Sequence, residues 1–288
     1  MLKILNILNP FNTETFSEKK EKWSYYQALP SKKVQTNKFK YGVCTIPHPE
    51  KVAKGGEDAY FAGSSLLAVA DGVGGWATLN IDPALYSREL CKNIEHLHKL
   101  DCKKYEKNPK QLLKDSAIMT MSIGSSTCLI ISINEIMPIL YSSYIGDSGF
   151  LILRRVSKDF KCVYHSIEHC RSFNFPYQIG SSGDSPNIAL STEHHIENND
   201  IIIAGSDGLF DNLDDENIVN CVLPFVGDDD KVADLNLISE AIAEAAFQIS
   251  IDPKSLSKFA LNAKKNNIKF RGGKRDDITV IVAQVELI

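Results

Sequence analysis

Short apolar runs separated by turn residues dominate the chain from residue 41 onward. The runs are rich in β-branched and aromatic side chains, which favour β-strands. They are long enough for strands but too short for most helices. The predicted strands lie within residues 41–47, 58–63, 65–71, 125–133, 139–146, 149–156, 161–167, 200–207 and 277–287.

Helical spacing of apolar residues occurs in longer segments between these strands. Residues 82–99 repeat apolar positions every three to four residues, and Pro83 suits the first turn of a helix. Residues 235–250 show the same spacing with glutamates on the opposite face, and residues 109–122 show a weaker version. Because strands mostly follow strands instead of alternating with helices, the order predicts an α+β fold of antiparallel sheets with helices packed outside.

The first forty residues differ in composition from the rest. Residues 1–40 hold eight lysines, three glutamates and no arginine, which is equally typical of an organelle-targeting leader and of a flexible, solvated tail. The apolar start is interrupted by Lys3 and stopped by Pro10, so a secretory signal is not expected. Residues 41–288 contain no repeat or linker, and we predict one domain there.

The composition of the chain argues against nucleic acid, a membrane span and zinc. The chain has 288 residues, 43% of them hydrophobic, with a formal net charge of −4, so we expect a globular protein without a nucleic-acid partner. No run of eighteen apolar residues occurs, and no membrane span is expected. The seven cysteines are spread out with no C-x-x-C pair, which favours reduced thiols over a zinc site.

Carboxylates stand at the ends of several apolar runs. Any single Asp-Gly pair is explained by turn chemistry, because Asp bonds its own backbone and Gly allows positive φ. That explanation is weaker for the whole set, since the flanking strands are too apolar to be solvated. The residues concerned are Glu57, Asp58, Asp71, Asp147, Asp207, Asp211, Asp276 and Asp277.

If neighbouring strands bring these ends together, the like charges need a cation among them. Oxygen ligands without nearby His or Cys favour Mg²⁺ or Mn²⁺ over zinc. The spacing of an EF-hand, the glycines of a P-loop and the G-x-S-x-G of a serine nucleophile are all missing from the sequence. A pair of hard cations held by carboxylates is suited to the hydrolysis of phosphate esters.

Six ordered motifs then point to a family. GGEDAY, VADGVGGW, GSSTCLI, YIGDSGF, AGSDGLFDN and KRDDITVIV resemble the metal-dependent serine/threonine protein phosphatases, the protein phosphatase 2C family, over residues 41–288. DGVGGW and FNFPYQIG look most like the subgroup named for a T-cell-activation phosphatase homologue, whose animal members are mitochondrial. The resemblance implies a four-layer α-β-β-α sandwich with a metal cleft at one end and a phosphoprotein substrate. We expect a monomer in mitochondria or cytoplasm.

The resemblance also implies roles for individual residues. Asp71 matches the carboxylate that bridges two Mn²⁺ or Mg²⁺ ions. Asp207 and Asp276 match ligands of the first ion, and these three aspartates are the predicted catalytic residues. Glu57 and the backbone carbonyl of Gly72 match ligands of the second ion.

Three further aspartates have matches around this pair of ions. Asp58 matches a residue in or just behind the ligand shell. Asp147 and Asp211 fall where the family can hold a third, weaker ion. Residues 166–199 fall where the family carries a flap beside the cleft, and we expect this segment to contact substrate.

Two positions depart from the family pattern. Val73 replaces the histidine proposed as general acid, and Ala53 replaces the arginine that grips phosphate. Lys54, with Lys51 close by, is the predicted phosphate-binding residue. Because of these losses, a pseudophosphatase or phosphoprotein-binding module on the same fold stays as the alternative to an active enzyme.

Overall fold

The computed structural model describes residues 35–157, 159–227, 232 and 234–288. The chain divides into two compact units, Met1–Gln35 and Thr36–Ile288, and nearly all described residues belong to the second. Of the predicted extension, residues 1–40, the part from residue 1 to residue 34 lies outside the described residues. Strand β1 begins at Lys38, before the predicted start of the domain at residue 41.

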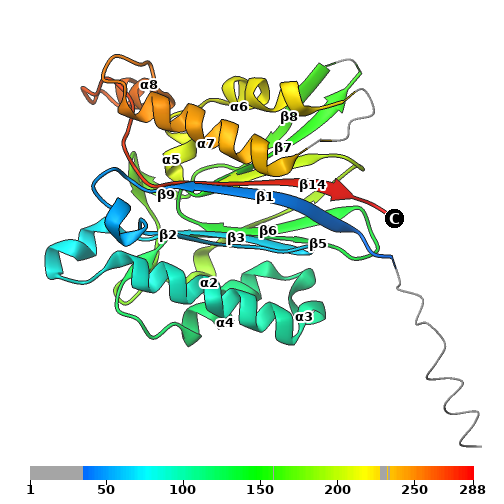
Figure 1. Ribbon diagram of the computed structural model, residues 1–288. Helices are drawn as coiled ribbons and strands as arrows, with labels where there is room; N and C mark the ends of the chain where they lie inside the picture. The colour runs from blue at the N-terminus through cyan, green and yellow to red at the C-terminus, as the bar shows by residue number, and fades with distance from the viewer. Residues whose placement is uncertain (1–34, 158, 228–231, 233) are drawn as a thin grey trace, which may run out of the picture. The chain divides into compact units, whose positions relative to one another are not determined.

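Two five-stranded antiparallel sheets form the centre of this unit (Figure 1). One has the order β1-β14-β13-β7-β8, made of Lys38–Ile46, Ile278–Glu286, Ile201–Gly205, Gly149–Val156 and Asp159–His165. The other has the order β12-β6-β5-β3-β2, made of Leu190–His195, Ile139–Ile145, Cys128–Ile133, Leu66–Asp71 and Asp58–Ala62. All strands predicted from the sequence are present, and β12 is an additional edge strand.

The strands are apolar on both faces because each sheet is covered on both sides. In β3, Leu67 and Val69 pack into the core between the two sheets. Leu66, Ala68 and Ala70 point the other way, into the core beneath the helices. Both sets are fully buried, which explains why the strand reads as a continuous apolar run instead of an alternating one.

Helices cover the outer faces of both sheets (Figure 1). On the β3 side lie α2 (Pro83–Leu100), α3 (Cys102–Glu106) and α4 (Pro109–Met119), and α2 begins with Asp82 accepting from Ala84 N. On the β14 side lie α5 (Asp207–Phe210), α6 (Asp215–Val222) and α7 (Leu235–Ile251), with α8 (Lys258–Lys265) nearby. The predicted α-β-β-α order of layers is confirmed.

Short elements complete the chain. The 3₁₀ helices are η1 (Val52–Lys54), η2 (Gly74–Leu79), η3 (Pro186–Ile188) and η4 (Leu223–Phe225). The small strands are β4 (Ser125–Ser126), β9 (Cys170–Ser172), β10 (Phe175–Pro176) and β11 (Ile179–Gly180). The end of the predicted flap, residues 166–199, differs from the prediction, because Leu190–His195 is β12 of the main sheet. Residues 166–189 are called the flap below, and pairing of β11 with β4 ties them to the edge that carries the acidic residues. No helix in the described part of the chain is long and apolar enough to cross a membrane.

Candidate metal centre

The β2–β3 hairpin places two of the predicted aspartates face to face. Asp58, the first residue of β2, is the register partner of Asp71, the last residue of β3. Glu57 and Gly72 flank them, and Gly72 N donates to Glu57 O at 3.2 Å. A Cβ on residue 72 would lie 2.7 Å from Glu57 O and 2.8 Å from Pro83 O. Only glycine therefore allows this close packing beside Asp71.

The second sheet delivers its carboxylates to the same end of the sandwich. Asp207 follows the end of β13, and Asp276 precedes the start of β14. These strands are antiparallel, with Gly205 opposite Val280, so the end of one lies beside the start of the other. Asp147, in the turn between β6 and β7, comes to this edge as well, because Gly149 is opposite Gly205.

Asp71 lies where the charges of both sheets meet. Burial is the main cause that raises the pKa of its carboxyl group well above the usual value, and the charges of Asp58, Asp207, Asp276 and Asp147 raise it further. Without a counter-charge these groups cannot all stay ionised. The predicted convergence of strand-end carboxylates is therefore present in the structure.

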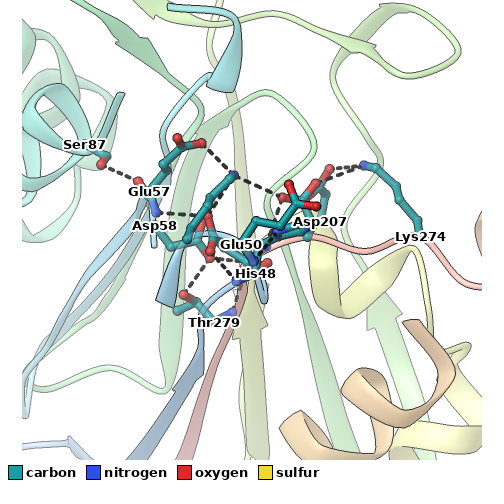
Figure 2. A network of polar contacts seen from close by, with 12 residues as sticks. His48, Glu50, Glu57, Asp58, Ser87, Asp207, Lys274 and Thr279 are labelled. Atoms are coloured by element: carbon teal, nitrogen blue, oxygen red, sulfur yellow. Dashed lines mark hydrogen bonds and ion pairs between the residues drawn. The ribbon is translucent and has the colours of Figure 1, made fainter. Parts of the chain in front are cut away.

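Asp58 is held from behind by two hydroxyl groups (Figure 2). Ser206 Oγ and Thr279 Oγ1 both donate to Asp58 Oδ2, each at 2.7 Å. Burial nevertheless raises the pKa of Asp58, since the two hydrogen bonds only partly offset it. The other oxygen, Asp58 Oδ1, is buried and has no hydrogen-bond partner among the described residues. The sequence did not single out Ser206 or Thr279, because ordinary strand residues in different segments gain this role only through the fold.

A lysine that the sequence reasoning missed lies among the carboxylates. Lys274 Nζ contacts Asp207 Oδ2, lies 2.6 Å from Asp211 Oδ2 and 3.7 Å from Asp276 Oδ2 (Figure 2). Its side chain is only 16% exposed. Burial lowers the pKa of Lys274, but the three carboxylates outweigh burial and raise it. Lys274 is therefore a fixed positive charge beside Asp207 and Asp211.

Asp277 and Lys51 form a second charged group. Lys51 approaches Asp276 Oδ1, whereas Lys274 approaches Asp276 Oδ2. Asp277 Oδ1 accepts from His48 N at 2.7 Å, and its Oδ2 accepts from Glu57 N at 2.9 Å. Lys51 Nζ lies 2.6 Å from Glu57 Oε2 and 3.1 Å from Asp277 Oδ2. Lys54, the predicted phosphate-binding residue, is exposed, and its carbonyl accepts from Arg88. The geometry thus favours Lys51 over Lys54 as the cation nearest the carboxylates.

The residues fit hard divalent cations by their chemistry. No group of three or more His, Cys, Asp or Glu among the described residues is arranged to hold a metal ion as it stands, and Lys51 and Lys274 occupy the spaces between carboxylates. The available donors are all oxygens, which hard cations prefer. Two of them, Asp58 Oδ1 and Asp207 Oδ1, are buried without a hydrogen-bond partner in the described part of the chain. Burying a carboxylate oxygen without a partner lowers the stability of the fold, and a bound cation would remove that penalty.

A hydrogen-bonded chain connects this edge to the flap. Val73 N donates to Ser125 O at 3.0 Å, and Trp76 Nε1 donates to Ser125 Oγ at 2.6 Å. Ser125 Oγ in turn donates to Gln178 Oε1, in the flap, at 2.5 Å. The GVGGW segment is therefore hydrogen-bonded both to the edge that carries the carboxylates and to the flap.

Curated relatives decide the family. The chain is 36% identical over 260 residues to the probable protein phosphatase 2C 26 of Arabidopsis thaliana, covering 85% of this chain and 83% of the relative. The chain belongs to the protein phosphatase 2C family. It is also 39% identical to the probable protein phosphatase 2C 55 of the same plant, spanning 85% of this chain but about half, 51%, of that relative. A PTC7 homologue of Drosophila grimshawi is 34% identical over 82% of this chain and 81% of its own length. No family model matches the chain.

Solved structures agree with this membership. The photosystem II phosphatase PBCP superposes with a TM-score of 0.78 at 32% identity, over 87% of this chain and 100% of the other. The catalytic domain of the serine/threonine phosphatase PstP, solved with two manganese ions, shares the fold with a TM-score of 0.61 at 18% identity over 87% of this chain and 100% of the other. The predicted family and fold are confirmed, and the pseudophosphatase alternative is not favoured.

Proposed function

We propose that this chain hydrolyses phosphoserine and phosphothreonine esters in proteins with two Mn²⁺ or Mg²⁺ ions held at the carboxylate edge. The observation that carries the proposal is the convergence of strand-end carboxylates from both sheets on Asp71. When bound, such ions lower the pKa of a coordinated water and neutralise the charge on the phosphoryl oxygens.

The chain's own residues divide the work of holding the ions. Asp71 lies between the carboxylates of the two sheets and is the one that both ions would share. Asp207 and Asp276 would complete the ligands of one ion. Glu57 and the carbonyl of Gly72 would complete those of the other. Asp58 is tethered by hydroxyl groups and would orient the set from below.

A third, weaker ion near Asp147 and Asp211 would compete with Lys274 for Asp211. The ammonium group of Lys274 already neutralises Asp211 at 2.6 Å. A cation between Asp147 and Asp211 would have to displace it or share the pocket with it. We therefore expect this site to bind less tightly than the two at Asp71.

Lys51 is the proposed cation for the phosphate group. It is partly buried at the rim of the carboxylate edge and already close to Glu57. If an ion takes over Glu57, the ammonium group becomes available to an anionic ligand. Lys54 is the less favoured candidate for binding the phosphate group, because its side chain is exposed.

The proposed setting is a monomer in mitochondria or cytoplasm. The lysine-rich composition of residues 1–40 supports an organelle leader and a solvated tail equally. Fractionation of cells that express the tagged full chain, followed by sizing of the purified protein, tests both points. Recovery of the protein from the medium would exclude the proposed location.

The function itself is tested by phosphate release from a phosphothreonine peptide and from p-nitrophenyl phosphate. Turnover should require added Mn²⁺ or Mg²⁺ and stop with EDTA. Asp71→Asn should lose several orders of magnitude in rate, whereas Asp159→Asn, an exposed strand residue, should match the unmodified protein. Turnover that survives EDTA would refute the proposal, and tight peptide binding without any turnover would favour the pseudophosphatase alternative.

A further inference from the structure

Helix α8 and the segment after it carry an unusual concentration of positive charge. Residues 253–275 contain eight Lys and Arg residues and no Asp or Glu, in a chain whose net charge is −4. Four of the exposed cations line one hollow of about 690 Å³. We call these four, Lys254, Lys264, Lys269 and Arg271, the α8 basic surface.

These four cations are not neutralised by neighbouring carboxylates. None of them is in an ion pair with another residue in the ranges that the structure describes. The nearest acidic neighbour in sequence, Asp252, uses its side chain to accept from Lys254 N at 2.8 Å. Phe259, Phe173 and Phe270 form the ring contacts at this face and add no negative charge. The positive charge is therefore available to a ligand.

The hollow also exposes large apolar side chains between the cations. Leu256 is 76% exposed, and Leu261, Ile268 and Phe270 are exposed too. All four line the same hollow as the basic side chains. Exposed apolar groups ringed by charge are typical of an interaction site.

The α8 basic surface is joined to the carboxylate edge by short connections. Phe259 N donates to Asp211 O at 2.7 Å, and Asp211 also pairs with Lys274. Phe173, at the turn of the flap, packs its ring 4.9 Å from the ring of Phe259. These contacts place α8 beside Asp211 and the flap, so a polypeptide with one residue at the carboxylates could continue past the flap onto α8.

We infer that the α8 basic surface binds an acidic segment, carrying at least one large apolar side chain, of the phosphoprotein on which the enzyme acts. The charge of the surface complements acidic residues, and the hollow between the cations accepts the apolar side chain. That the segment belongs to a substrate rests on the proposed function. A recessed hollow next to the reaction site suits a peptide better than a flat lipid surface.

The binding test uses a fluorescent, unphosphorylated peptide in which Leu and Phe are flanked by Glu residues, measured by anisotropy. The unmodified protein should bind it, and added NaCl should weaken binding. The Lys264→Glu/Lys269→Glu protein should bind at least about tenfold more weakly, because attraction becomes repulsion. The matched Lys103→Glu/Lys107→Glu protein, changed at exposed lysines near α3, should bind like the unmodified protein.

A second variant and a second ligand keep the test decisive. Lys254→Ser/Arg271→Ser removes charge without reversal and should also bind more weakly. Equal peptide binding by the unmodified protein and both α8 variants would overturn the inference. The inference would also be overturned if the unmodified protein cosedimented with vesicles of phosphatidylcholine and phosphatidylserine but did not bind the peptide.

Failure of the surface can be told apart from failure of the proposed function. Anisotropy with the unphosphorylated peptide depends on neither metal nor turnover. If binding follows the expected pattern but no phosphopeptide is hydrolysed, the surface stands and the proposed function fails. If turnover occurs, the ratio of kcat/KM for acidic over neutral phosphopeptides should fall about tenfold in the Lys264→Glu/Lys269→Glu protein, and an unchanged ratio would contradict a role in substrate choice.

Discussion

Asp58 and Asp71 lie directly opposite each other at the open end of the β2–β3 hairpin. The hairpin therefore sets two carboxylates side by side at the end of two strands that are otherwise built for a core. Asp58 has hydroxyl partners behind it, while Asp71 faces the aspartates of the other sheet. This pairing gives the protein a buried negative centre that needs positive charge to be stable.

The hydroxyl group of Thr279, one of the two that donate to Asp58, should strengthen metal binding. Thr279→Val keeps the shape of the side chain but removes one donor to Asp58 Oδ2. We expect a loss of about 1 to 3 kcal/mol in the free energy of unfolding and roughly tenfold weaker Mn²⁺ binding by calorimetry, since the ligand-orienting bond is lost. Thr192→Val, in edge strand β12, removes a 2.6 Å hydrogen bond to Ser142 of β6 and should leave Mn²⁺ affinity unchanged. Equal affinity in both variants would contradict a positioning role for Thr279.

Lys274 should act as the counter-charge of the metal-free protein. Lys274→Met keeps the apolar stem but leaves Asp207 and Asp211 without their ammonium partner. The metal-free variant should lose about 3 kcal/mol or more of unfolding free energy. Saturating Mn²⁺ should restore much of that loss, because ions that bind only the folded state stabilise it by mass action.

Urea unfolding with and without Mn²⁺ measures the two effects of Lys274. Lys103→Met, an exposed lysine change, serves as the control and should alter neither curve. A Lys274→Met protein that is destabilised equally in both conditions would show that the lysine supports the fold and not the charge balance of the centre.

Val73 tests whether the enzyme lacks a general acid. Serine and threonine alkoxides need a proton on leaving, whereas nitrophenolate does not, and a general acid contributes about 10² to 10⁴-fold. Val73→His should therefore raise the rate on a phosphoserine peptide more than the rate on p-nitrophenyl phosphate. Steady-state kinetics on both substrates decides the matter. Equal changes in the two rates would mean that another group already supplies the proton.

The sequence predicted the elements that carry strong local patterns. Runs such as residues 65–71 and 277–287 identified the strands of both sheets. The carboxylates at their ends indicated the edge where the acidic residues of both sheets converge. Edge strand β12 was missed because its burial alternates along a polar LSTEHH sequence. Helices α6 and α8 were missed because eight residues give too few turns for a clear periodicity.

The side-chain partners of the site could not be predicted in the same way. Asp277 gains its role from the backbone of His48 and Glu57, which lie far away in the sequence. The spacing of Lys51 and Lys54 does not reveal which one faces the carboxylates. The turn of η1 decides this, with Gly55 at φ 76° after it. Local sequence thus indicates which groups are present, and the tertiary fold decides which of them meet.

The number of Mn²⁺ ions that depend on Asp71 distinguishes a shared two-ion centre from separate sites. Isothermal titration of the metal-free protein with Mn²⁺ should give two tight sites per chain, and Asp71→Asn should weaken both together, because both ions would be held by that carboxylate in the proposed centre. Circular dichroism of the variant confirms that it is folded. Loss of only one site in Asp71→Asn, or unchanged binding of both ions, would contradict the shared-carboxylate centre.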